Sequence, residues 1–121
     1  MYYKVLNNFL KMDYQKFETQ IKKWILEYVI LGVISKKDSY SSDILAILKV
    51  HNLIIVEGTL YPLLSRLKND WYVSYYWKES ISWPPRKYFK ITDSGKLLFK
   101  ELDKIWQGTK KSINDIINFI S

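Results

Sequence analysis

The residues of this chain that could do chemistry are basic and hydroxyl side chains, and many of them fall in one stretch. Residues 57–90 contain six basic and three acidic side chains, among them Arg66, Lys68, Arg86 and Lys87. Guanidinium and ammonium groups bind phosphates, and hydroxyl groups can donate hydrogen bonds to them. The whole chain has a formal charge of +7 and a pI near 9.5. This balance favours an anionic partner such as nucleic acid or a membrane surface.

Catalytic and metal chemistry are not expected. The 121 residues include no cysteine and a single histidine, His51, which we expect to end a helix rather than to act as a base. No Gly-rich phosphate loop or Gly-x-Ser-x-Gly motif is present, and the carboxylates are scattered. We therefore predict no enzyme activity, no metal and no cofactor. The longest apolar run falls well short of the ~18–20 residues of a spanning helix, and no secretion signal is evident, so we expect a cytoplasmic protein without a membrane partner.

Two helices are predicted in the first half of the chain, after an N-terminal arm or short helix at residues 1–17. From Glu18 to about Ser35 the apolar residues cover more than one face, so most of this helix should be buried; they are Ile21, Trp24, Ile25, Tyr28, Val29, Leu31 and Gly32. Ser41 or Ser42 is a good N-cap for the second helix. We expect that helix to end at His51 and Asn52, and its buried face to consist of Ile44, Ile47 and Leu48.

In the second half of the chain the spacing of the apolar residues changes from that of a helix to that of a strand and then back to that of a helix. A third helix is predicted from Glu57 or Gly58 to Asn69, and its inner face is formed by Leu60, Leu63, Leu64 and Leu67. Pro62 must lie in the first turn of this helix or bend it. Residues 72–77 and 86–91 alternate and are rich in aromatic residues, which predicts a hairpin. Residues 53–56 are a short connector or strand. Thr92 or Asp93 should then cap a long final helix.

Three helices followed by a hairpin form a winged helix-turn-helix. The predicted fold is therefore mainly α with a small β-hairpin: residues 18–91 form the winged unit and residues 92–121 a long C-terminal helix for dimerisation. That helix has an apolar stripe that needs a partner, for which a second copy of the chain is the economical choice. The stripe includes Leu98, Leu102, Ile105, Ile113, Ile116, Ile117 and Ile120.

Several spaced motifs resemble the PadR family of bacterial transcriptional regulators. They are GTLYPLLSRLKND at residues 58–70, Trp77, PPRKYFKIT with Asp-Ser-Gly at 84–95, and Trp106. The chain departs from the family pattern at Lys68, where the family has Glu, and at Ser41, Trp71 and Trp83, where it has Gly. A glycine after a helix end usually adopts the left-handed conformation, which costs a bulky residue roughly 1–2 kcal/mol. Either Trp71 bears this cost or Asn69 or Asp70 takes that conformation instead.

The resemblance implies that the third helix enters the DNA major groove while the wing meets the phosphate backbone. The expected DNA-binding residues are Ser41, Ser42, Thr59, Tyr61, Pro62, Ser65, Arg66, Lys68, Lys78, Arg86 and Lys87. Four of these have competing interpretations. Arg66 could form a structural ion pair, Tyr61 could be a core residue, and Ser41 and Ser42 could be simple caps.

The resemblance also implies a homodimeric repressor on a palindromic operator, with dimerisation through the first and last helices. Trp106, with Trp24 and Tyr28, would then line an interface cavity for a small aromatic effector; the alternative is that Trp106 only packs at the interface. A different class of function also fits the sequence. The chain could be a dimeric winged-helix scaffold or protein-interaction module that has lost specific DNA recognition.

Overall fold

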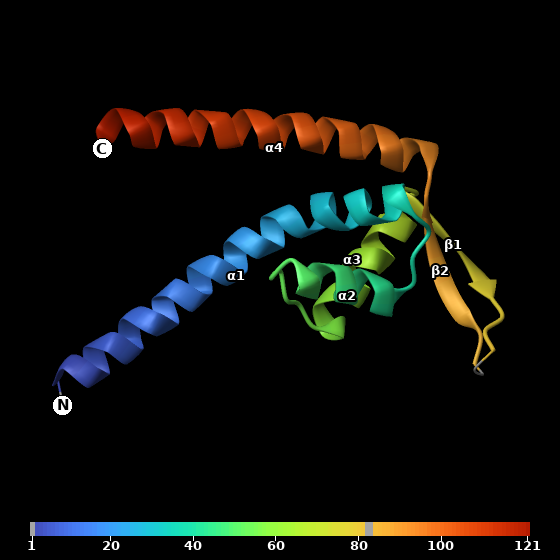
Figure 1. Cartoon of the computed structure of the whole chain (residues 1–121), viewed down its shortest axis with the longest axis horizontal. Helices are drawn as coiled ribbons and strands as arrows, with labels where there is room; N and C mark the ends of the chain where they lie inside the picture. The colour runs from blue at the N-terminus through green and yellow to red at the C-terminus, as the bar shows by residue number, and fades with distance from the viewer. Residues whose placement is uncertain (1, 82–83) are drawn as a thin grey trace.

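The computed structural model describes residues 2–81 and 84–121, and confirms a mainly helical fold with one hairpin (Figure 1). The elements in chain order are α1 (Tyr2–Lys36), α2 (Ser41–Val50), α3 (Glu57–Asn69), β1 (Val73–Lys78), β2 (Arg86–Ile91) and α4 (Asp93–Ile120). In Figure 1, α1 and α4 meet near the hairpin and diverge toward the two termini. Trp83, one of the predicted departures from the family, lies outside the described residues.

The first helix is longer than predicted. Residues 2–17 are not a separate arm but continue into the helix that was expected from Glu18, giving 35 residues. The N-terminal part of this helix projects away from the other elements (Figure 1), and Ile21 and Trp24 are exposed, Trp24 to 74%. The prediction that most of its circumference is buried is therefore wrong for this part. Leu26, Ile30, Leu31 and Ile34 form its buried face instead.

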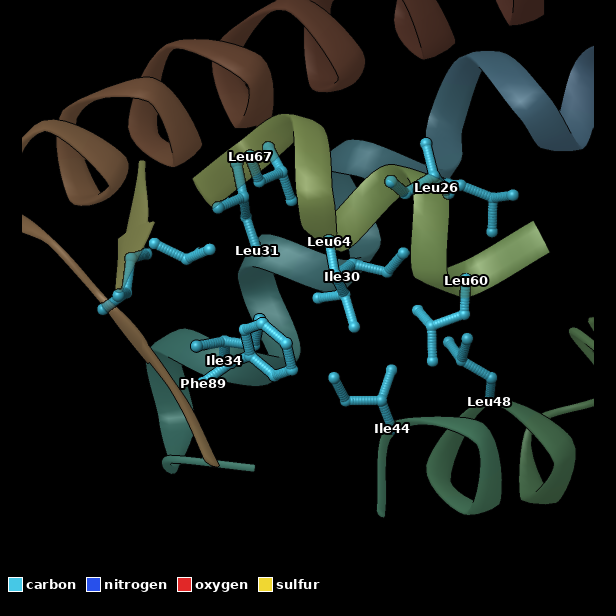
Figure 2. Packing of buried hydrophobic residues seen from close by; sticks show 13 residues of the cluster. Leu26, Ile30, Leu31, Ile34, Ile44, Leu48, Leu60, Leu64, Leu67 and Phe89 are labelled. Carbon is cyan, nitrogen blue, oxygen red and sulfur yellow. The ribbon is translucent and has the colours of Figure 1, made fainter. Parts of the chain in front are cut away.

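The core lies between α1, α2 and α3 and also includes Val73, Phe89 and Ile91 of the hairpin (Figure 2). Leu60, Leu63, Leu64 and Leu67 of α3 are all buried, which confirms the predicted inner face. Ile44 and Leu48 of α2 pack into the same cluster. Ile47 was also predicted to point inward, but this prediction is wrong. Its side chain is 42% exposed and lies beside the buried face that Ile44 and Leu48 form.

Local signals at α2 and α3 were partly misjudged. The N-cap of α2 is Tyr40 rather than Ser41 or Ser42, and the side chain of Asp43 accepts a hydrogen bond from the Tyr40 N–H at 3.4 Å. Residues 53–56 form a connector and not a strand. Pro62 is the sixth residue of α3, beyond its first turn. Its ring nitrogen therefore cannot donate to the carbonyl of Gly58, which lies on the exposed side of the helix.

The hairpin is bonded along both edges of β2. On one edge, β2 pairs antiparallel with β1 from Val73 opposite Ile91 to Lys78 opposite Arg86. On the other edge, Ser39 and Phe89 exchange two backbone hydrogen bonds, at 3.1 and 2.8 Å. The linker between α1 and α2 thus forms an isolated bridge to the outer edge of the two-stranded sheet. This contact fixes the wing against the helices.

The turn after α3 carries the strain that the sequence suggested. Trp71 itself takes the left-handed conformation, with φ of 64°, so Asn69 and Asp70 do not relieve it. The N–H groups of Trp71 and Tyr72 bond to the carbonyls of Lys68 and Leu67 at 3.1 and 2.9 Å, which is the Schellman pattern. The end of α2 repeats this pattern with Asn52, also at φ 64°.

The start of α4 holds the strained turn in place. The hydroxyls of Thr92 and Ser94 both donate to the carbonyl of Trp71, at 2.6 and 2.7 Å. Thr92 is also the N-cap of α4, as predicted, and accepts from the Gly95 N–H at 3.0 Å. A Cβ at Gly95 would lie 2.0 Å from the Tyr72 carbonyl oxygen, so only glycine allows α4 to approach the turn this closely.

An ion pair connects the polar side of α3 to α1. The Arg66 guanidinium pairs with the Glu27 carboxylate, and both side chains remain partly exposed. The structure therefore shows Arg66 in the ion pair that was the alternative to DNA contact. A DNA role for Arg66 would require a phosphate to replace Glu27, and it stays a prediction.

The strain at Trp71 leads to a stability prediction. Because this side chain is 78% exposed, Trp71→Gly removes little packing while relieving the left-handed strain. We expect the free energy of unfolding to rise by about 1 kcal/mol, measured by thermal or urea denaturation. Asn52→Gly is the matched control, because asparagine tolerates this conformation, and should gain only a few tenths of a kcal/mol. A loss of stability in Trp71→Gly would show that the exposed indole makes contacts that outweigh the strain.

The Arg66–Glu27 pair can be measured by a double-mutant cycle. Arg66→Ala, Glu27→Ala and the double variant should give a favourable coupling of about 0.5–1 kcal/mol, the upper range for a partly exposed pair. The coupling should fall in 1 M salt because the pair is partly screened. A coupling indistinguishable from zero in low salt would mean that Arg66 is free for another partner.

Candidate nucleic-acid interface

The exposed surface of α3 has two sides. Tyr61, Ser65 and Lys68 face the wing, and their polar groups are open to solvent. Thr59, Pro62 and Arg66 lie on the other side, where they border α1 near Lys22. The structure therefore divides the predicted recognition residues between two flanks of one helix.

The flank toward the wing forms a groove of about 450 Å³ between α2, α3 and the hairpin, here named the wing groove. It brings together six residues predicted to bind DNA: Ser41, Tyr61, Ser65, Lys68, Arg86 and Lys87. The other residues that line it are Tyr40, Leu64, Asn69, Trp77 and Phe89. Its lining holds three cationic side chains and no carboxylate, so the groove attracts anions. The two remaining predicted wing and cap residues, Ser42 and Lys78, are exposed but do not line it.

The cations of the wing groove rest on aromatic rings. The Lys87 ammonium lies 3.9 Å from the centroid of the Tyr75 ring, and the Arg86 guanidinium lies 4.6 Å from that of Tyr40. A ring face attracts a cation and limits the rotamers of its long side chain. The ring leaves the outer N–H groups of the cation available to a ligand. The wing groove is therefore partly organised before any ligand binds.

Tyr61 is a surface residue, so its interpretation as a core residue is wrong. Its side chain is 48% exposed, and its hydroxyl lies 3.3 Å from the Ser41 hydroxyl. This contact connects the start of α2 to the outer face of α3. It places two hydroxyl groups at one end of the wing groove.

The opposite face of the hairpin is less suited to an anion. There the Tyr76 hydroxyl donates to the Asp38 carboxylate at 2.8 Å, and this hydrogen bond raises the pKa of Tyr76. The Lys78 ammonium lies 5.6 Å from the Tyr88 ring on the same face. The Asp38 carboxylate lines the same face as Lys78 and Arg86 and offsets part of their positive charge.

The structure does not gather the predicted effector residues in one chain. Tyr28 stacks on Phe99 of α4 with ring centroids 5.4 Å apart, and its hydroxyl donates to Asp103 at 2.6 Å. Tyr28 and Phe99 line a cavity of about 670 Å³, but Trp24 and Trp106 do not belong to its lining. Effector release therefore stays a prediction.

The predicted dimerisation residues separate into two groups. Leu98 and Leu102 pack against the core of their own chain and are partly buried there. The more distal part of α4 has no such cover, and five predicted residues are exposed there: Ile105, Ile113, Ile116, Ile117 and Ile120.

Sequence reasoning missed Tyr40, Tyr75 and Trp77. The alternation of the two predicted strands could have identified the last two, because Trp77 pairs with Lys87 and Tyr75 with Phe89 on one face. Tyr40 could not be found this way, since its position depends on the contact between the α1–α2 linker and β2. Across residues 2–81 and 84–121, no three His, Asp or Glu side chains come together as metal ligands, and no helix is long and apolar enough to cross a membrane.

Comparisons with known proteins show the family to which this fold belongs. The model of the transcriptional regulator PadR-like family matches residues 30–101. A PadR-like transcription factor from Bacteroides fragilis is 46% identical, with a TM-score of 0.71 over 84% of this chain and 98% of its own. A PadR-like transcriptional regulator from Bacillus cereus is 31% identical, with a TM-score of 0.75 over 81% and 96% of the two chains.

An uncharacterized protein of Lysinibacillus sphaericus is 32% identical over 92 residues, which cover 74% of this chain and 84% of the relative. The family match includes the C-terminal end of α1, all of α2 and α3, the hairpin and the start of α4. It therefore covers the elements that form the wing groove. The chain belongs to the PadR-like family of transcriptional regulators.

Proposed function

We propose that this protein is a cytoplasmic transcriptional repressor that binds double-stranded DNA through α3 and the wing groove. The observation that carries this proposal is the wing groove itself, which joins the exposed face of α3 to three cationic side chains without a carboxylate. A scaffold without DNA function is less well supported, because it gives no reason for this arrangement of charge.

In the proposed complex, α3 lies in the major groove. Tyr61 and Ser65 reach base edges from the exposed face of α3, with Thr59 near its N-terminal end. Lys68, Arg86 and Lys87 bind the phosphate backbone along one side of the groove. The Ser41 hydroxyl, at the start of α2, is placed to donate to a neighbouring phosphate. Bound promoter DNA would be closed to other proteins, which is the basis of repression.

We further propose that the repressor is a homodimer. The exposed isoleucines of α4 form a stripe that a second copy would cover, and a two-fold axis would pair each stripe with itself. The N-terminal part of α1 also projects beyond the body with Ile21 and Trp24 exposed, and it could extend the same interface. Such a dimer presents two α3 helices to half-sites about 34 Å apart, which requires a palindromic operator.

DNA binding can be tested with duplexes from upstream of the protein's own gene in a salt series. We expect affinity for one inverted repeat to fall steeply with salt while a scrambled duplex binds much more weakly. Ser65→Ala should reduce the preference for the inverted repeat over the scrambled duplex, by about 1 kcal/mol, with little change in the salt slope. Weak binding of equal strength to every duplex would favour the scaffold instead.

The dimer can be tested by analytical ultracentrifugation. Ile113→Glu puts a charge into the exposed stripe and should shift the protein toward monomer. Asn114→Glu is the matched control, because it adds the same charge to an exposed position next to the stripe, and it should remain dimeric. If both variants behave alike, the interface lies elsewhere. A monomeric wild-type protein at micromolar concentration would exclude the proposed dimer.

A further inference from the structure

One aromatic ring of the wing carries two cations from different elements. The Tyr75 ring of β1 lies beneath the ammonium of Lys87 from β2, 3.9 Å from its centroid, and beneath that of Lys68 from α3, at 5.1 Å. In the part of the chain that the structure describes, every other aromatic side chain with a cation over it holds only one. Tyr75 therefore contacts one cationic side chain of α3 and one of the wing.

The ring is held in a fixed position. The Tyr75 and Trp77 rings pack edge to face, with centroids 6.5 Å apart and planes at 87°, and the Phe89 ring centre lies 6.4 Å from that of Tyr75. Phe89 is buried and its backbone is bonded to Ser39. Tyr75 thus stands on the rigid part of the hairpin and not on its loop.

Two like charges on one ring repel each other unless an anion joins them. Within the described residues, no carboxylate forms an ion pair with Lys68 or Lys87. Both side chains line the wing groove, where Ser65 and Asn69 add hydrogen-bonding groups beside them. A ring covers one side of each ammonium and leaves the other N–H groups pointing away from it. Because both ammonium groups lie near one ring centroid, at 5.1 and 3.9 Å, and both residues line the same groove, one tetrahedral anion in that groove is within reach of both flexible side chains.

We propose that Lys68 and Lys87, held on the Tyr75 ring, bind one phosphate of the DNA backbone, with Tyr75 as their positioning residue. The proposal rests on the proposed DNA-binding function and adds a specific phosphate site to it. The shared phosphate connects α3 to the wing, so both elements dock on the duplex in one register. Tyr75 makes no base contact in this arrangement and acts only through the two lysines.

The salt dependence of DNA binding tests whether one phosphate is shared. Each neutralised phosphate contributes about 0.9 to the slope of log affinity against log salt. Lys68→Ala and Lys87→Ala should each lower the slope by less than this, and the double variant should lower it by about 0.9 in total. A decrease of about 1.8 would mean two separate phosphates, and an unchanged slope would mean none; either result would overturn the proposal. Lys96→Ala, an exposed lysine on α4 outside the wing groove, is the charge control and should leave the slope unchanged.

The role of Tyr75 is tested by two variants with different expected results. Tyr75→Phe keeps the ring face, so its affinity should stay within about twofold of wild type. Tyr75→Leu removes the ring and should weaken binding about threefold to tenfold, while leaving the Lys68→Ala/Lys87→Ala background almost unaffected. Circular dichroism of each variant verifies that the hairpin is folded. Equal losses in Tyr75→Phe and Tyr75→Leu, or a full loss in the double-lysine background, would overturn the positioning role.

The outcome for the wild-type protein separates this proposal from the proposed function. If the wild type shows steep, salt-dependent binding and the lysine variants do not change the slope, only the shared phosphate site is wrong. If the wild type shows no salt-dependent binding to any duplex, both proposals are wrong.

Discussion

Burial of the four leucines on one face of α3 is the constraint on which the rest of the structure depends. Leu60, Leu63, Leu64 and Leu67 pack on α1 and α2, and each fully buried side chain contributes about 1.5–3 kcal/mol. Small domains are stable by only about 5–15 kcal/mol, so rotation of α3 about its axis would be very costly. The opposite face, with Tyr61, Ser65 and Lys68, is therefore presented to solvent in a fixed orientation.

A second set of contacts places the wing relative to that face. Ser39 bonds to Phe89 on the free edge of β2, and Thr92 and Ser94 bond to the carbonyl of Trp71 at the turn between α3 and β1. Together they connect the hairpin to α1, α3 and α4. Gly95 lets α4 approach the turn closely enough for these bonds to form. The left-handed backbone conformation of Trp71 is therefore stabilised by these hydrogen bonds and not by the conformational preference of tryptophan.

The sequence predicted the parts of the fold that depend on local periodicity. The leucine face of α3, the two strands of the hairpin and a cap at Thr92 or Asp93 could be predicted, because each follows from apolar spacing at the helical or strand period or from a local side-chain bond; the pairing register of the strands was not predicted. The length of α1 could not be predicted, because the apolar spacing of residues 2–17 is only loosely helical and their helix stands largely apart from the core (Figure 1). Ile47 and Trp24 were misplaced because periodicity does not show where a neighbouring element ends.

The residue types of the candidate site could be predicted from the sequence, but not which side chains contact one another. Lys68, Arg86 and Lys87 were expected near DNA, yet nothing local shows that Lys68 and Lys87 share one ring, since this depends on how the wing packs beside α3. Arg66 illustrates the same limit. A cation on an exposed helix face suggests a phosphate contact, and only the position of α1 reveals that Glu27 already pairs with it.

The claim that α3 and the wing groove form the DNA surface is tested most directly by amide chemical-shift changes during titration with the preferred duplex. The account predicts that the largest changes fall at Tyr61, Ser65 and Lys68 and on the wing-groove side of β2, while the distal half of α4 changes little. Changes confined to α4 or to the N-terminal half of α1, with α3 unaffected, would contradict it.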